Sequence, residues 1–79
     1  MHEEQWLAVI DKHVATVAPE LAGGLSTLDC SLADLGLNSI DRAEVTTLLM
    51  EEFGVAPPIH ELGGVSDLRS LVTLLGRYL

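Results

Sequence analysis

One serine in this sequence stands where a phosphate ester is physically favourable. Ser39 follows Asn38, whose short polar side chain is typical of a helix N-cap, and Asp41 lies three positions after that cap. The first turn of an α-helix has backbone N–H groups without partners and the positive end of the helix dipole, and both stabilise an attached or bound phosphate. On position alone, a serine here is more often a helix-start residue with no further role.

The other reactive side chains do not form a catalytic or metal-binding set. His2, His13 and His60 lie in separate segments without the spacing of metal ligands. No base stands beside Ser39 in the local sequence to activate it as a nucleophile. Cys30, the only cysteine, cannot form an internal disulfide or a CxxC set, and we interpret it as a half-buried loop thiol. We therefore expect no enzyme and no metal site.

Length and charge narrow the class of protein further. The 79 residues, 48% of them apolar, suffice for one small domain with a single core over residues 1–79. No apolar run approaches the roughly 18 residues of a membrane span, and the first residues lack the order of a signal peptide, so we expect a cytoplasmic protein. The formal charge of -8 repels nucleic acid and anionic lipid heads, and we expect neither as a partner.

Helices must hold Ser39 in place, because aromatic residues make up only 4% of the chain and the strict alternation of strands is absent. A first helix is predicted from about Glu3 to Val17, where apolar residues recur at spacings of three and four. Pro19 and the pair Gly23-Gly24 break that pattern, and a long connection pinned by leucines follows. The buried positions predicted in these segments are Trp6, Ile10, His13 or Val14, Val17, Leu25, Leu28 and Leu32.

Three further helices are predicted after the connection. The second begins after the Asn38 cap and continues to Phe53, where Gly54 stops it. Pro57-Pro58 prevent its continuation, and residues 60–62 allow about one turn of a short third helix. The cap and apolar stripe of a fourth helix are Ser66 or Asp67, Leu68, Leu71, Val72 and Leu75. The expected fold class is all-α, a small bundle of three main helices and a short third one.

The residues around Ser39 match a longer pattern. Asp34-Leu35-Gly36-Leu37-Asn38-Ser39-Ile40-Asp41-Arg42-Ala43-Glu44-Val45 resembles the D-L-G-x-D-S-L-D-x-V-E-L stretch of acyl carrier proteins. The similarity continues over Glu51-Glu52-Phe53-Gly54-Val55 and the fourth helix, so that it covers the whole chain. So many aligned positions in a chain of this length, acidity and helix order make the resemblance specific.

The resemblance implies an acyl-carrier-like four-helix bundle in which Ser39 carries 4'-phosphopantetheine. A phosphopantetheinyl transferase would attach that arm covalently from coenzyme A, and its terminal thiol would hold acyl groups as thioesters. The domain itself would catalyse no reaction. Asn38 departs from the Asp that is usual in the family. Asn caps a helix about as well as Asp, so the fold should be retained, but one negative charge beside the attachment site is lost.

The stretch from Asn38 to Ala43 also resembles free-standing carriers of bacterial polyketide clusters, particularly those that work with hydroxymethylglutaryl (HMG)-synthase-like enzymes in beta-branching. We therefore expect a monomeric, stand-alone polyketide carrier. Its implied partners are the transferase, a ketosynthase or acyltransferase, or HMG-synthase-like enzymes with basic docking patches. The open alternatives are a carrier of fatty-acid or peptide synthesis, an unmodified acidic interaction module, and an enzyme that uses Cys30. The sequence leaves the acyl group open.

Two faces of the second helix predict how partners dock. On a helical wheel, the residues that cluster toward the core are Val45, Thr46, Leu49 and Phe53. A second stripe, formed by Ile40, Ala43, Thr47 and Met50, lies on another side of the helix, beside a group of acids that also includes Glu52. We interpret this second face as the surface for a partner with an apolar slot rimmed by Lys or Arg. The alternatives are that the stripe packs under the short helix or the loop, and that the acids are only a solvated face. The predicted partner-binding residues are Ile40, Asp41, Ala43, Glu44, Thr47, Met50 and Glu51.

Overall fold

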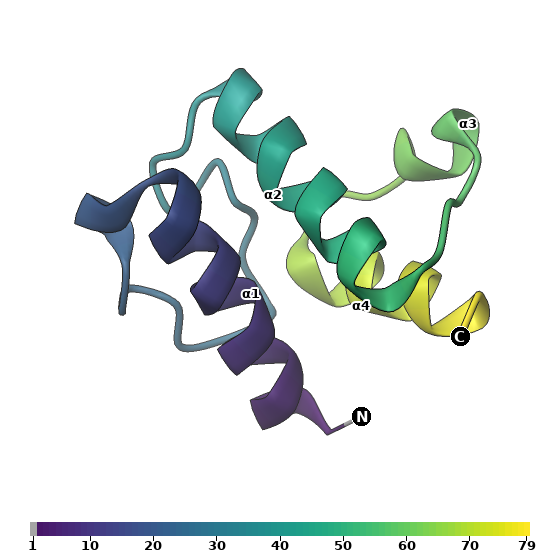
Figure 1. Cartoon of the computed structure of the whole chain (residues 1–79), viewed down its shortest axis with the longest axis horizontal. Helices are drawn as coiled ribbons and strands as arrows, with labels where there is room; N and C mark the ends of the chain where they lie inside the picture. The colour runs from purple at the N-terminus through teal and green to yellow at the C-terminus, as the bar shows by residue number, and fades with distance from the viewer. Residues whose placement is uncertain (1) are drawn as a thin grey trace.

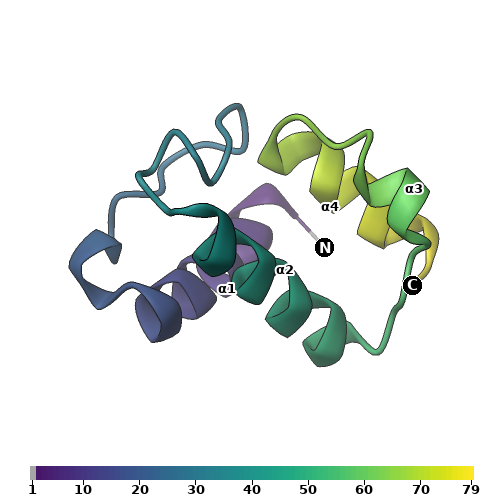
Figure 2. The same cartoon turned by 90° about the horizontal axis from the view of Figure 1, so that it is seen from above.

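Helices are the main regular elements of residues 2–79, the part of the chain that the computed structural model describes. The elements in chain order are α1 (Glu3–Val17), the 3-10 turn η1 (Pro19–Leu21), α2 (Ser39–Phe53), α3 (Ile59–Leu62) and α4 (Leu68–Arg77). α1 and α2 lie side by side and run in roughly opposite directions, whereas α3 and α4 lie together on the right of Figures 1 and 2. The predicted all-α class, with three main helices and a short third one, is confirmed.

The α1 helix has the predicted bounds and most of the predicted core stripe. Trp6, Ile10 and Val14 are buried, and full burial of such side chains stabilises a fold by about 1.5–3 kcal/mol each. The ring of Trp6 packs on that of Phe53 in α2 with 4.9 Å between centroids. Of the two candidates His13 and Val14, the core takes Val14, because the His13 side chain turns toward an acid on α2.

The long connection between η1 and α2 is held by leucines, as predicted, and by α4. Leu28 and Leu32 are buried, and so is Leu37, which the sequence patterns do not single out. Two backbone hydrogen bonds, Leu68 N–H to the Cys30 carbonyl (2.8 Å) and Arg69 N–H to the Leu28 carbonyl (2.9 Å), join the loop to the start of α4. The loop that leads into α2 is therefore fixed to the start of α4, although residues 22–38 contain no helix.

Local signals define both ends of α2. The Asn38 side chain accepts a hydrogen bond from the backbone N–H of Asp41 at 2.8 Å, which is the predicted cap. The Asp41 side chain does not return a hydrogen bond to the Asn38 backbone, so the reciprocal pair of a capping box does not form. At the other end Gly54 has φ +66°, a left-handed conformation that glycine adopts without the steric cost of a Cβ atom.

The α4 helix completes the core, and α3 only borders it. Asp67, one of the two predicted caps, and Ser70 exchange side-chain hydrogen bonds with each other's backbone N–H. The buried positions of α4 include Leu74, which was not predicted, whereas Val72 is only half-buried. No residue of α3 is fully buried. Besides the partly buried Leu62, the hydroxyl of Tyr78 holds α3 by donating a hydrogen bond to Glu61.

Candidate functional site

Ser39 is the first residue of α2, and its hydroxyl faces solvent. Within residues 2–79 no group forms a hydrogen bond with Ser39 Oγ, and the first-turn N–H groups of Ser39 and Ile40 have no partner either. The Asn38 cap satisfies the next donor, the N–H of Asp41. An oxygen that is accessible, unpaired and beside free N–H donors suits the attachment of a phosphate group.

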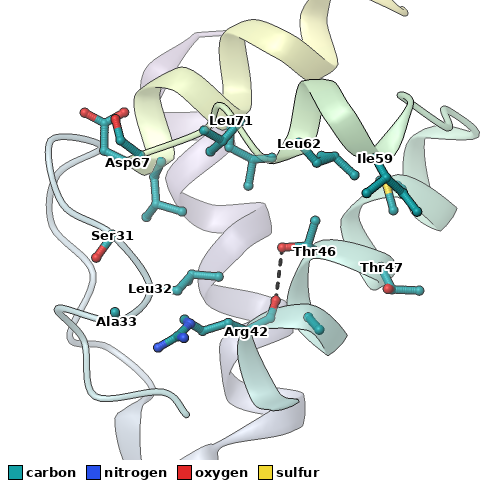
Figure 3. A pocket seen from close by; sticks show the side chains of 15 residues that line it. Ser31, Leu32, Ala33, Arg42, Thr46, Thr47, Ile59, Leu62, Asp67 and Leu71 are labelled. Carbon is teal, nitrogen blue, oxygen red and sulfur yellow. Dashed lines mark hydrogen bonds between the residues drawn. The ribbon is translucent and has the colours of Figure 1, made fainter. Parts of the chain in front are cut away.

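A largely apolar groove of about 700 Å³ lies between α2, the connection loop, α3 and the start of α4. Figure 3 shows Thr46 and Thr47 of α2 on one wall, Leu32 of the loop at one end, and Ile59 and Leu62 of α3 at the other end. Leu68 and Leu71 of α4 also line the groove. Patterns in the sequence do not reveal this groove, because four separate segments form it.

The predicted partner stripe of α2 divides into an exposed part and a groove-lining part. Ile40 exposes 75% of its surface, and Ala43 and Thr47 are also exposed. Met50 is only half-buried and packs against the core, while Ala43, Thr47 and Met50 all line the groove. The alternative interpretation, in which the stripe packs beneath α3, therefore holds for part of the stripe. On the far side of the groove, Ile59 exposes 87% of its surface and adds an apolar residue that the sequence analysis missed.

One carboxylate of the predicted acidic face of α2 is paired with side chains of α1, and the others are not. Glu44 and Glu51 are exposed and Asp41 is half-buried, and none of the three forms an ion pair within residues 2–79. Glu52, in contrast, accepts from Lys12 Nζ at 2.6 Å and lies 2.8 Å from His13 Nε2, both on α1. Glu52 therefore differs from the other acids of this face, because its carboxylate joins α2 to α1.

The Glu52 cluster predicts a pH dependence of stability. The hydrogen bond from Lys12, and to a smaller extent that from His13, lowers the pKa of Glu52. Because its pKa is lower in the folded chain than in the unfolded chain, the ionised carboxylate stabilises the fold above about pH 4.3, and this stabilisation is lost as the pH falls through the folded pKa. We expect Glu52→Gln to reduce the free energy of unfolding at pH 7, and to reduce it less at pH 3.

Urea unfolding of wild type and variant at both pH values measures this difference. Glu51→Gln is the matched control, because it removes a neighbouring exposed carboxylate that has no ion-pair partner in the described part of the chain. We expect the control to lack the extra loss of stability at pH 7. Equal changes in the two variants at both pH values would show that the Glu52 contacts do not stabilise the fold.

The remaining reactive groups stay apart. Burial and the nearby Asp34 carboxylate raise the pKa of the Cys30 thiol, and its Sγ donates to the Thr27 carbonyl, so the thiol is a weak nucleophile. Residues 2–79 contain no group of three or more His, Cys, Asp or Glu side chains arranged to hold a metal ion. In the same residues, every helix is too short or too polar to cross a membrane.

Comparisons with known proteins agree with this geometry. The family described as phosphopantetheine attachment site (PP-binding) matches residues 9–75. The polyketide biosynthesis acyl-carrier-protein AcpK of Bacillus subtilis (strain 168) is 32% identical over 75 residues, which cover 95% of this chain and 92% of that protein. A chain in the crystal structure of the curacin biosynthetic pathway HMG synthase in complex with acetyl donor-ACP matches with a TM-score of 0.79 and 34% identity, covering 98% of this chain and 99% of that one.

Proposed function

The chain belongs to the phosphopantetheine attachment family of carrier proteins, and we propose that Ser39 is the residue to which its phosphopantetheine is attached. Proteins of this family are carriers and not enzymes, and the prosthetic group is covalently bound. The observation that carries the assignment is the exposed Ser39 hydroxyl, which has no hydrogen-bond partner in residues 2–79 and begins the helix α2. Ser39 also occupies the serine position of the motif that runs from Asp34 to Val45.

The residues around Ser39 would contribute to holding the prosthetic group in different ways. Asn38 fixes the helix start through its hydrogen bond to the Asp41 N–H, which leaves the N–H groups of Ser39 and Ile40 available to the phosphate. No His, Asp or Glu side chain in the described residues contacts the Ser39 hydroxyl, so a phosphopantetheinyl transferase must supply the base that accepts its proton. When bound, the group supplies a terminal thiol on which acyl groups are held as thioesters.

We further propose that the carrier, over residues 1–79, acts in bacterial polyketide biosynthesis with an HMG-synthase-like enzyme, in beta-branching. The similarity to AcpK and to the acetyl donor-ACP of the curacin HMG synthase complex supports this pathway. The acidic and apolar face of α2, with Ile40, Glu44 and Glu51 exposed, suits a partner whose docking site is apolar and rimmed by Lys or Arg. Transfer of acyl groups by ketosynthases or acyltransferases would use the same face.

The proposal is tested in two steps. The intact chain is incubated with coenzyme A and a promiscuous phosphopantetheinyl transferase, and its mass should rise by one phosphopantetheine. No increment with several competent transferases would favour an unmodified interaction module. The acetyl-loaded chain is then offered to an HMG-synthase-like enzyme and to a fatty-acid ketosynthase. Faster turnover with the HMG-synthase-like enzyme supports the pathway, and the reverse preference would assign the carrier to fatty-acid synthesis.

A further inference from the structure

Arg42 is the basic residue of α2, and it does not fit either face of that helix on the helical wheel. It lies three residues after Ser39, which places the two side chains on the same side of the helix, one turn apart. Its guanidinium turns back toward the helix start, where Nη1 donates to the Leu37 carbonyl at 3.2 Å. A positive charge therefore lies next to the attachment position, in a region of the chain where acids predominate.

The other basic side chains of the described residues are placed elsewhere. Lys12 is paired with Glu52, and Arg69 is paired with Asp29 and Glu3. Arg77 lies at the far end of α4. Arg42 forms no ion pair within residues 2–79, and the Leu37 carbonyl occupies only one of its five N–H donors. The remaining donors are free to bind an anion.

Arg42 also links the attachment position to the groove. Ser39 does not line the groove, and Arg42 is the first residue of α2 that does. Figure 3 shows its side chain directed across the groove toward the loop of Ser31, Leu32 and Ala33. Arg42 is the only basic residue of the lining, and the Asp67 carboxylate that also borders the groove is engaged in capping α4.

We propose that Arg42 is a positioning residue for the prosthetic group, an inference that rests on the attachment at Ser39. The guanidinium binds the phosphate of the attached group and directs the arm toward the groove between α2 and α3. A planar guanidinium suits a phosphate because it donates two parallel hydrogen bonds. The pairing also offsets the repulsion between that phosphate and the carboxylates of Asp41 and Glu44, which belong to the same two turns of α2.

Nuclear magnetic resonance of the labelled chain, before and after attachment, tests this role without an activity assay. In the wild type, attachment should shift the Nε–Hε resonance of Arg42 and the backbone amides of Ala33 and Thr46, which line the groove. In Arg42→Gln the groove amides should lose most of that shift, and the phosphorus resonance should move toward that of the same phosphodiester in the urea-unfolded chain. Arg42→Lys keeps the charge without the planar donor pair, and should retain part of the shift.

Arg77→Gln is the control for the lost charge, because Arg77 is exposed and outside the groove. It should leave every shift caused by attachment unchanged. An Arg42 resonance that does not respond to attachment in the wild type would overturn the proposal, and this result does not depend on the folding of any variant. Groove shifts that persist in a folded Arg42→Gln would overturn it as well. The mass increment distinguishes a failure of the attachment from a failure of the role of Arg42. Its absence contradicts attachment itself, and its presence without these shifts contradicts only the role of Arg42.

Discussion

Replacing Ser39 with alanine is expected to abolish the attachment of phosphopantetheine while leaving the helical fold intact. The substitution removes the oxygen that would bond to phosphorus. It leaves no buried polar group unsatisfied, because Ser39 is exposed and its hydroxyl contacts no described residue. The cap of α2 is also retained, since it belongs to Asn38. Intact-mass measurement after incubation with coenzyme A and the transferase detects the loss, and circular dichroism checks the fold.

Two other serines provide matched controls for this experiment. Ser26 and Ser66 are exposed and lie in loops, outside the first turn of a helix. Ser26→Ala and Ser66→Ala should both acquire the full mass increment at the wild-type rate. An increment that persists in Ser39→Ala would place the attachment at a different residue. Loss of the increment in a control variant that is folded would show that the assay does not report on Ser39 alone.

The ends of the helices could be predicted from the sequence because local interactions determine them. Asn38 and Asp67 cap their own helices, and Gly54 adopts the left-handed conformation that ends α2. Each of these signals involves residues within four positions of one another, so that the order of side chains suffices to recognise it. The position of Ser39 at a helix start follows from the same local rule, which is why the candidate attachment residue was accessible to sequence reasoning.

Contacts between distant segments could not be predicted in this way. Leu37 enters the core because the connection loop is tied to α4 by the hydrogen bond from Leu68 N–H to the Cys30 carbonyl. A helical wheel gives the direction in which the Glu52 side chain leaves α2. It does not show that Lys12 and His13 of α1 lie within reach of that side chain. Both cases depend on residues about 40 positions apart, for which periodicity carries no information.

Met50 illustrates the same limit within the candidate site. The wheel places it in the second stripe and not in the core stripe, which favours an exposed contact residue. In the structure, residues of α3 and of the loop line the same groove as Met50, so that Met50 is half-buried and forms part of the groove wall. The sequence thus identifies the face of α2 that points toward partners, whereas the depth of that face depends on α3, whose placement no local pattern determines.

Reversing two charges on the exposed face of α2 is expected to slow association with enzyme partners by about tenfold or more at low salt. The double variant is Glu44→Lys with Glu51→Lys. Both side chains are exposed and form no ion pair within residues 2–79, so the substitution breaks no described contact and the chain should stay folded. Each exposed charge pair is worth only about 0–1 kcal/mol, and the effect should therefore appear chiefly in the association rate. Stopped-flow measurement with the transferase and an HMG-synthase-like enzyme gives that rate.

The salt dependence separates specific docking from a general effect of net charge. Exposed charges separated by more than about 8 Å are largely screened at physiological ionic strength, so the wild-type association rate should fall as salt is added and approach that of the variant. Glu4→Lys with Glu20→Lys is the matched control, because it makes the same change in net charge at exposed acids of α1 and η1. If the acids of α2 form the docking face, the control associates nearly as fast as the wild type. If both double variants slow association equally, or if the rate is insensitive to salt, the acids of α2 contribute solubility and do not orient the partner.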